Sequence, residues 1–304
     1  MAESYKNQHI VCQAYLNRFA TKTGKHYIIG TRLQSPKQGV KLFTNSVSNV
    51  AYIENYYDTC VKNDKKFWEH YLDKEFDALC GQPLGNIVAK ITLCPTDRRV
   101  LTEDDKALLS RIIISQILRV PAFLDEHVVK SEGMLEGFKQ EILNNLPPVF
   151  ENQRHLIEQI SFDSDERKDM VLSSVFDQKR FFKFCNILQR KVWFVFYNEI
   201  RGVMPFITSD NPVVITDIKG REETMTSIGL ANNKTVILYP LTPSILIGIY
   251  SSELFLGSIE KFDGYRMPID EMKFITNVNL MLMRQSYIHS FLPEPLFTMA
   301  KCSG

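Results

Sequence analysis

Residues 102–121 hold the feature that most constrains the fold of this chain. Thr102 and the acidic residues after it are typical of a helix start, and Pro121 marks the helix end. Between them, residues 108–120 are apolar around almost the whole helix surface. Such a helix has to be covered by other elements on every side. We therefore expect the central helix of the core at this position.

Two arginines interrupt the apolar surface of this helix. Arg111 and Arg119 fall on one face, and Gln116 lies three residues before Arg119. Buried guanidinium groups need carboxylate partners. The sequence offers Glu75, on the apolar face of an earlier amphipathic helix, and Asp210, in a turn between two strands.

That turn lies within residues 206–215, which have the pattern of a strand, the segment Thr-Ser-Asp-Asn-Pro, and a second strand. Such a turn would present the Asp210 carboxylate and the Ser209 hydroxyl together at a sheet edge. In the alternative interpretation, Asp210 only caps its own turn through a hydrogen bond to the backbone.

Changes in sequence pattern divide the chain into three regions. Residues 1–60 alternate short strands and turns, with a hairpin expected over residues 27–43. Residues 61–190 are helical and include the amphipathic helix at residues 68–79, while residues 191–304 return to strands with a late helix. We expect a single α+β domain. Its helical middle segment packs against a mixed or antiparallel sheet built from the N- and C-terminal parts.

The charge balance gives no evidence for a nucleic-acid or membrane partner. The formal net charge of +1 over 304 residues makes no global demand for nucleic acid or an anionic membrane. Locally, residues 1–50 hold seven Lys or Arg against one acid, and residues 121–177 hold twelve acids against five bases. This asymmetry favours two attracting faces or solvated helices over a groove for a polyanion.

Cysteine usage and hydropathy indicate a cytoplasmic protein. The six cysteines are scattered without a Cys-x-x-Cys pair, which is typical of reduced, buried thiols. The N-terminus lacks an apolar signal core, and the most apolar run, residues 235–250, contains Pro240 and Pro243. We therefore expect no membrane association.

Several motifs occur in the order in which a known family carries them. Residues 7–20 (NQHIVCQAYLNRFA) match a His-x-x-Pro-x-x-Tyr-Leu-x-x-Phe pattern. Further matches are Val47–Ala51 leading to Tyr56-Tyr57, Glu75, Gln116–Pro121, Phe206–Pro212, Tyr239–Pro243, and the closing helix from Asp270 through Asn279 to Arg284. On these matches, over about nine-tenths of its length, the chain resembles the family named domain of unknown function 4238.

This family is mostly bacterial and has no assigned activity, and the resemblance implies a role in defence or stress. Two positions depart from the family pattern. Cys12 stands where the family usually has proline, so the bend after His9 is less constrained. Ile53 and Glu54 stand where the family places a glutamate before an aromatic residue, which leaves the equivalent acid unassigned.

His9 is the main candidate for acid–base chemistry. A neutral imidazole near Glu75 or Asp210 could act as a general base or acid, whereas the alternative is a histidine that caps the helix after it. His9 and Cys12 could offer two zinc ligands, but no second pair with suitable spacing exists. A divalent cation on His9, Glu75 and Asp210 is a further alternative, and no resident metal is assigned.

These residues lead to two functional hypotheses. In the first, the protein is a hydrolase or nuclease-like effector, with His9, Glu75 and Asp210 as catalytic residues. Gln116, Arg119, Ser209 and Asn7 would then bind a phosphorylated small molecule or a nucleic acid. In the second, the same cluster belongs to a non-catalytic ligand-binding or sensor module, or is a structural ion network.

One ribonuclease motif offers a further alternative. Arg284 and His289 have the Arg-x4-His spacing of helical HEPN ribonucleases. Because Tyr287 and Ile288 are typical of the start of a terminal strand, the spacing is not expected on a helix.

Overall fold

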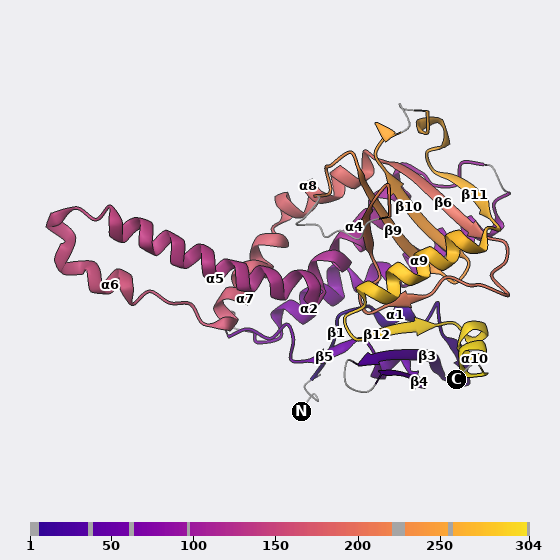
Figure 1. Ribbon diagram of the computed structural model, residues 1–304, viewed down its shortest axis with the longest axis horizontal. Coiled ribbons are helices and arrows are strands. Elements are labelled where there is room, and N and C mark those ends of the chain that lie inside the picture. The colour runs from indigo at the N-terminus through magenta and orange to yellow at the C-terminus, as the bar shows by residue number, and fades with distance from the viewer. Residues whose placement is uncertain are drawn as a thin grey trace.

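The computed structural model describes residues 6–35, 39–60, 64–95, 98–220, 229–254 and 258–302. Helices fill the middle of the chain and strands dominate both ends, so the predicted α+β class is confirmed (Figure 1). The helices are α1 (Gln13–Leu16), α2 (Phe67–Glu75), α3 (Gln82–Leu93), α4 (Glu103–Arg119), α5 (Pro121–Asn144), α6 (Arg154–Glu158), α7 (Ser164–Val175), α8 (Gln178–Gln189), α9 (Met272–Gln285) and α10 (Glu294–Cys302). Short 3-10 turns are η1 (Val47–Asn49), η2 (Asp77–Cys80), η3 (Pro148–Gln153) and η5 (Glu260–Phe262).

The strands form three sheets in the described part of the chain. They are β1 (Asn7–His9), β2 (Thr21–Thr23), β3 (His26–Ser35), β4 (Gly39–Ser46), β5 (Tyr52–Glu54), β6 (Val192–Asn198), β7 (Thr208–Ser209), β8 (Val214–Asp217), β9 (Thr235–Thr242), β10 (Ile245–Tyr250), β11 (Tyr265–Ile269) and β12 (His289–Leu292). The C-terminal sheet has the order β11-β6-β10-β9-β8 and is mixed, because β11 runs parallel to β6 and the other pairs are antiparallel. A second sheet has the order β2-β3-β12-β7, with β4 also on β3, and β1 pairs with β5.

The second sheet joins the two ends of the chain. Strand β12 lies antiparallel to β3, with Leu292 opposite Gly30, and also pairs with β7. The prediction that N- and C-terminal parts build one sheet is therefore confirmed. The predicted hairpin is β3 with β4, and residues 36–38 of its turn lie outside the described residues.

Helix α4 is buried as its sequence predicts. Eleven of its residues are buried, and Thr102 caps it in a capping box with Asp105. Its apolar side chains share one core with Trp193 on β6 and with Ile237 and Tyr239 on β9. Because alternate strand residues point to opposite faces, the neighbouring β9 residues pack instead with α9 in a second core. The mixed sheet thus lies between α4 and α9.

The predicted helix over residues 68–79 ends earlier than expected. Helix α2 stops at Glu75, and Phe76 leaves the helical region at φ −128° before η2 begins at Asp77. Extrapolating one continuous helix was therefore wrong. As a result Glu75 is 40% exposed, whereas Asp77 turns toward the end of α4.

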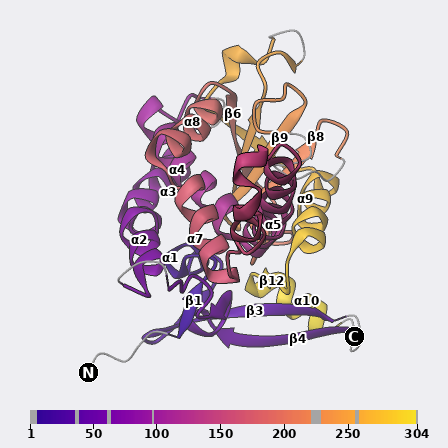
Figure 2. The same ribbon diagram turned by 90° about the vertical axis from the view of Figure 1, so that its left-hand side faces the viewer.

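Helix α5 starts directly after α4 and forms, with α6, an arm that projects from the rest of the molecule. The two helices meet at Val120 with a bend of 56°. Figure 1 shows α5 and α6 projecting from the rest of the molecule, and Figure 2 shows the same arm end-on. Among the described residues, no single helix is long and apolar enough to cross a membrane; only the bent pair α4 and α5 meets that test of length and composition.

Replacing Gly30 by alanine should destabilise the protein by about 1–3 kcal/mol. A Cβ at Gly30 would lie 2.6 Å from Phe297 Cδ2 and 2.7 Å from the Leu292 carbonyl, so β3 and β12 would have to separate. Urea unfolding of Gly30→Ala measures the change. The control is Gly202→Ala, whose added methyl group meets no atom within 4 Å. Equal stability of the two variants would contradict the close packing of β3 on β12.

Candidate functional site

The C-terminal end of α4 brings Arg119 to the junction of β1 and η2. Arg119 is 2% exposed. Its Nη1 donates to Asp77 Oδ1, and its Nη2 donates to Asp77 Oδ2 at 3.4 Å and to the carbonyl of His9. This arrangement is a bidentate ion pair extended to the backbone of the N-terminal strand.

Tyr57 completes the surroundings of the guanidinium group. Its hydroxyl donates to the Arg119 carbonyl at 2.9 Å and accepts from Arg119 Nε at 3.4 Å. The ring centroid lies 5.7 Å from Arg119 Cζ, within range of a cation–π contact. All three guanidinium nitrogens therefore donate to protein acceptors. Burial opposes the charge, but the attraction of Asp77 and Tyr57 outweighs it and raises the pKa of Arg119 well above its usual value.

The same helix end holds the next residue of the N-terminal strand. Gln116 Nε2 donates to the carbonyl of Ile10 at 2.8 Å. Gln8, which is fully buried, donates to Asp58 and accepts from the backbone N–H of Tyr57. Residues 8–10 are thus fixed by side chains on both sides. Gln116 and Arg119 contact backbone here, and their predicted role in substrate binding stays a prediction.

The His9 side chain lies beside this clamp and is held neutral. Burial and the nearby charge of Arg119 lower the pKa of His9 to about 4, against a smaller opposing contribution from the Ser48 backbone. Nδ1 lies 3.5 Å from Gln13 Nε2. Nε2 is buried and has no hydrogen-bond partner among the described residues. Because the Gln13 amide nitrogen can only donate, Nδ1 accepts and the ring hydrogen lies on Nε2, which can donate one further hydrogen bond at neutral pH.

Glu69 on α2 is the ionisable group that the sequence analysis missed. Burial raises the pKa of Glu69 to about 7; Arg119 opposes the shift, whereas Asp77 and Asp73 add to it. Its buried Oε2 has no partner among the described residues. Glu69 lies three residues before Leu72, so the periodicity used to select Glu75 could have identified it.

The pairing expected for Arg119 is wrong in both of its alternatives. Arg119 pairs with Asp77, not with Glu75 or Asp210. Glu75 does pair with the other arginine of the helix, as one of the predicted partners: its Oε2 lies 3.9 Å from Arg111 Nη2, in a half-exposed contact. The early end of α2 is the reason why Arg119 has a different partner. The backbone leaves the helix at Phe76, and Asp77 therefore lies beside Arg119.

Asp210 binds backbone at the start of β12. Its Oδ1 accepts from the N–H of Tyr287, and its Oδ2 accepts from those of Ile288 and His289, each at 2.7 Å. Burial raises the pKa of Asp210 to about 6, although these hydrogen bonds oppose the shift. Asp210 therefore caps a distant segment, whereas Ser209 closes the local turn by donating to the Asn211 carbonyl at 2.8 Å.

The predicted site residues consequently fall in separate places. The structure brings His9, Gln116 and Arg119 together, and Asn7 lies on the same strand β1 as His9. Within the described ranges, no hydrogen bond or ion pair joins this group to Glu75 or to Asp210. A cluster of His9, Glu69, Asp77, Arg119 and Tyr57, which we call the Arg119 cluster, is the candidate site.

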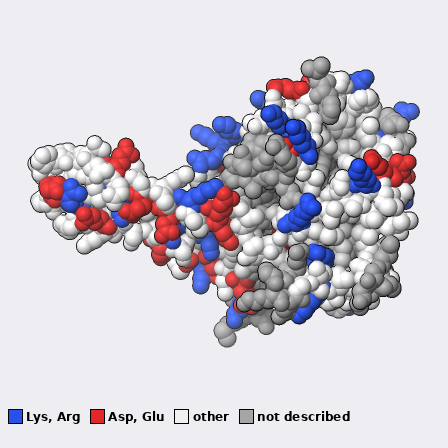
Figure 3. Space-filling view, in the orientation of Figure 1, with Lys and Arg blue, Asp and Glu red and all other residues white. Residues whose placement is uncertain are grey.

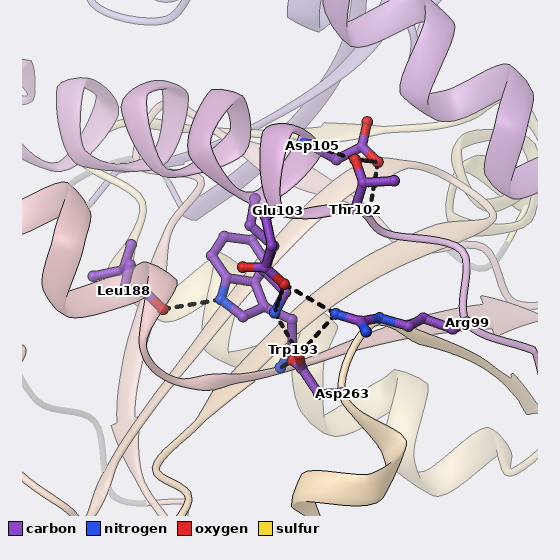
Figure 4. A network of polar contacts seen from close by, with 8 residues as sticks. Arg99, Thr102, Glu103, Asp105, Leu188, Trp193 and Asp263 are labelled. Carbon is purple, nitrogen blue, oxygen red and sulfur yellow. Dashed lines mark hydrogen bonds and ion pairs between the residues drawn. The ribbon is translucent and has the colours of Figure 1, made fainter.

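A second buried cation lies at the opposite end of α4. Lys106 is 2% exposed and pairs with Asp263, whose Oδ1 accepts from the backbone N–H of Trp193 at 2.9 Å. Figure 4 shows Arg99 between the carboxylates of Glu103 and Asp263, beside the Trp193 ring. The contacts of Asp263 with Lys106 and with the Trp193 backbone tie α4 to the sheet.

Neither proposed set of metal ligands assembles. In the part of the chain that the structure describes, no three His, Cys, Asp or Glu side chains gather as ligands. Cys12 Sγ, one partner in the zinc alternative, instead donates to the Asp77 carbonyl at 3.7 Å.

Comparison with known proteins places these motifs in a family. The model of a protein family of unknown function, DUF4238, matches residues 7–292. The chain belongs to DUF4238. The family named from the sequence motifs is therefore confirmed, and the match includes both the Arg119 cluster and the Asp210 turn. No curated protein and no solved structure shows a significant match.

In this DUF4238 protein, Arg119→Met should cost about 3–5 kcal/mol of stability, because it leaves a buried carboxylate without its cation. The control is Arg111→Met, which breaks a half-exposed pair worth about 1 kcal/mol or less. Urea unfolding with both variants compares the two losses. Similar losses would show that the Arg119–Asp77 pair is not a buried contact.

Proposed function

We propose that the Arg119 cluster is an acid–base site for hydrolysis or group transfer. Glu69 carries the proton, and neutral His9 is the second group that contacts the reacting molecule. The observation that supports this proposal is the pair of buried side-chain atoms without partners among the described residues, His9 Nε2 and Glu69 Oε2, in two groups that both feel the charge of Arg119. Asp77 retains 17% exposure of its side chain, so solvent reaches the cluster at that edge.

The ionisation states suit proton transfer at neutral pH. A carboxyl with a pKa of about 7 is present in both forms there, so Glu69 can give or take a proton. His9, with a pKa of about 4, stays neutral and can offer a hydrogen bond without a charge. Arg119 and Gln116 fix the backbone that carries His9 and are positioning residues in this proposal.

We place the substrate among phosphorylated molecules or nucleic acids and the protein in the bacterial cytoplasm, with a role in defence or stress. The resemblance of the motifs supports this assignment. The cysteines Cys12, Cys60, Cys80, Cys94 and Cys185 are free thiols, which is compatible with a reducing compartment.

A non-catalytic binding or sensor module is the second candidate. One observation favours it: four of the five guanidinium N–H groups of Arg119 already donate to protein acceptors, which leaves at most one donor of that side chain for an anionic substrate. In this alternative, the two unpartnered atoms of His9 and Glu69 recognise a small polar ligand without converting it.

The titration of Glu69 gives a pH test that needs no substrate. Its folded pKa of about 7 lies above the ordinary value of 4.5, so its contribution to stability is complete below pH 4.5 and is lost as pH rises through 7. Glu69→Gln should therefore flatten the decline of the melting temperature between pH 4.5 and 7.5. Glu75→Gln, on the same helix but 40% exposed, is the matched control. The same slope in Glu69→Gln and the parent protein would exclude the assigned titration.

Activity is tested by offering the purified protein phosphomonoesters, phosphodiesters, and single-stranded RNA and DNA. Glu69→Gln and His9→Asn should each lower any turnover by about 100-fold or more, as for loss of a proton-transfer group. Thermal shifts with nucleotides test the second candidate. Stabilisation by a ligand without turnover would favour binding, and turnover that survives both substitutions would eliminate the acid–base site.

A further inference from the structure

The arm formed by α5, η3 and α6 exposes several large apolar side chains that contact no other part of the described structure closely enough to be buried. Its tip and outer face carry exposed apolar side chains at Val129, Met134, Phe138, Val149, Phe150, Leu156 and Ile160. Helices α7 and α6 pack against α5, which leaves Met134 and Phe138 exposed. Figure 3 shows the arm with white surface between separate acidic and basic side chains. A projecting apolar surface of this kind marks an interaction site.

One face of α5 is complementary to itself when a second copy of the helix runs in the opposite direction. Lys130, Met134, Phe138 and Glu141 are separated by four, four and three residues, so they fall on one side of the helix. Met134 is 74% exposed and Phe138 is 61% exposed. The face thus reads cation, apolar, apolar, anion along the helix.

We propose that this face binds the same face of a second copy of the chain, with the two α5 helices antiparallel. A two-fold axis near residue 136 sets Met134 of one copy against Phe138 of the other, and the reverse. It also brings Lys130 of each copy within one turn of Glu141 of the other. The contact is isologous and closes as a dimer, because each side supplies both halves of every pair.

The charges on this face favour a second copy of the chain over an anionic membrane as the partner. Among the described residues, Lys130 pairs only with Glu126, four residues away on the surface, which is a weak interaction. The Glu141 carboxylate is exposed and has no ion pair among the described residues. An anionic membrane is disfavoured, because residues 121–177 hold twelve acids against five bases.

Glycines beside the apolar pair allow close approach of a second helix. Gly133 and Gly137 flank Met134 and Phe138, and a Cβ on either glycine would meet no atom within 4 Å. The Met134 and Phe138 side chains of the second copy can pack into the space beside them. The proposal concerns the arm alone and does not depend on the function of the Arg119 cluster.

Sedimentation equilibrium of the full chain over a concentration series tests the proposal. The parent protein should form a dimer, and Phe138→Ser should weaken the dimer by about 100-fold or more, since a symmetric contact loses two phenyl groups. The matched control is Val129→Ser. Val129 is 68% exposed on the same helix but lies about 180° around it from Phe138, so this variant should dimerise like the parent.

Charge reversal tests the pairing of the two helices. Lys130→Glu should weaken the dimer, and Lys130→Glu combined with Glu141→Lys should restore it, because the reversed pairs attract again. A parent protein that stays monomeric would overturn the proposal. So would a dimer equally sensitive to Phe138→Ser and Val129→Ser, and failure of the double variant to recover would overturn the antiparallel register.

Discussion

A buried cation near each end of α4 is the constraint on which the rest of the structure depends. Lys106 in the first turns and Arg119 in the last are both 2% exposed. Neither charge is tolerable inside the protein without a partner. Asp263, which pairs with Lys106, also binds the backbone of β6 in the mixed sheet. Asp77, which pairs with Arg119, begins η2, and Arg119 also binds the His9 carbonyl on β1. Sliding or rotating α4 would separate one of these pairs, so the helix fixes the mixed sheet relative to η2 and β1.

The fold was largely predictable because its strongest signals are local. The apolar residues of α4 cover almost its whole circumference, and the capping residues Thr102 and Asp105 lie just before the apolar segment begins. The strand pattern around Asp210 likewise needed no distant information. Local periodicity failed at Phe76, where the backbone leaves the helix one turn before the apolar pattern ends. That single departure replaces Glu75 by Asp77 as the partner of Arg119.

The site was less predictable because it depends on which groups remain unpaired. Arg119, Gln116 and His9 were selected by residue type and they do meet, but the roles of the first two could not be read without their backbone partners. Asp210 shows the same difficulty. A carboxylate in a turn has the pattern of a catalytic group, yet three N–H groups about 77 residues away along the chain occupy its oxygens. Sequence spacing carries no information on such distant contacts.

The pairing of β3 with β12 has a consequence for biosynthesis. The two strands are separated by roughly 250 residues of sequence, and β3 therefore emerges from the ribosome long before its neighbour. At about 5–20 residues per second, the delay is on the order of ten to fifty seconds. During that interval the nascent hairpin presents one open strand edge that could recruit other chains. A holdase that shields the edge during translation would therefore raise the yield of native protein.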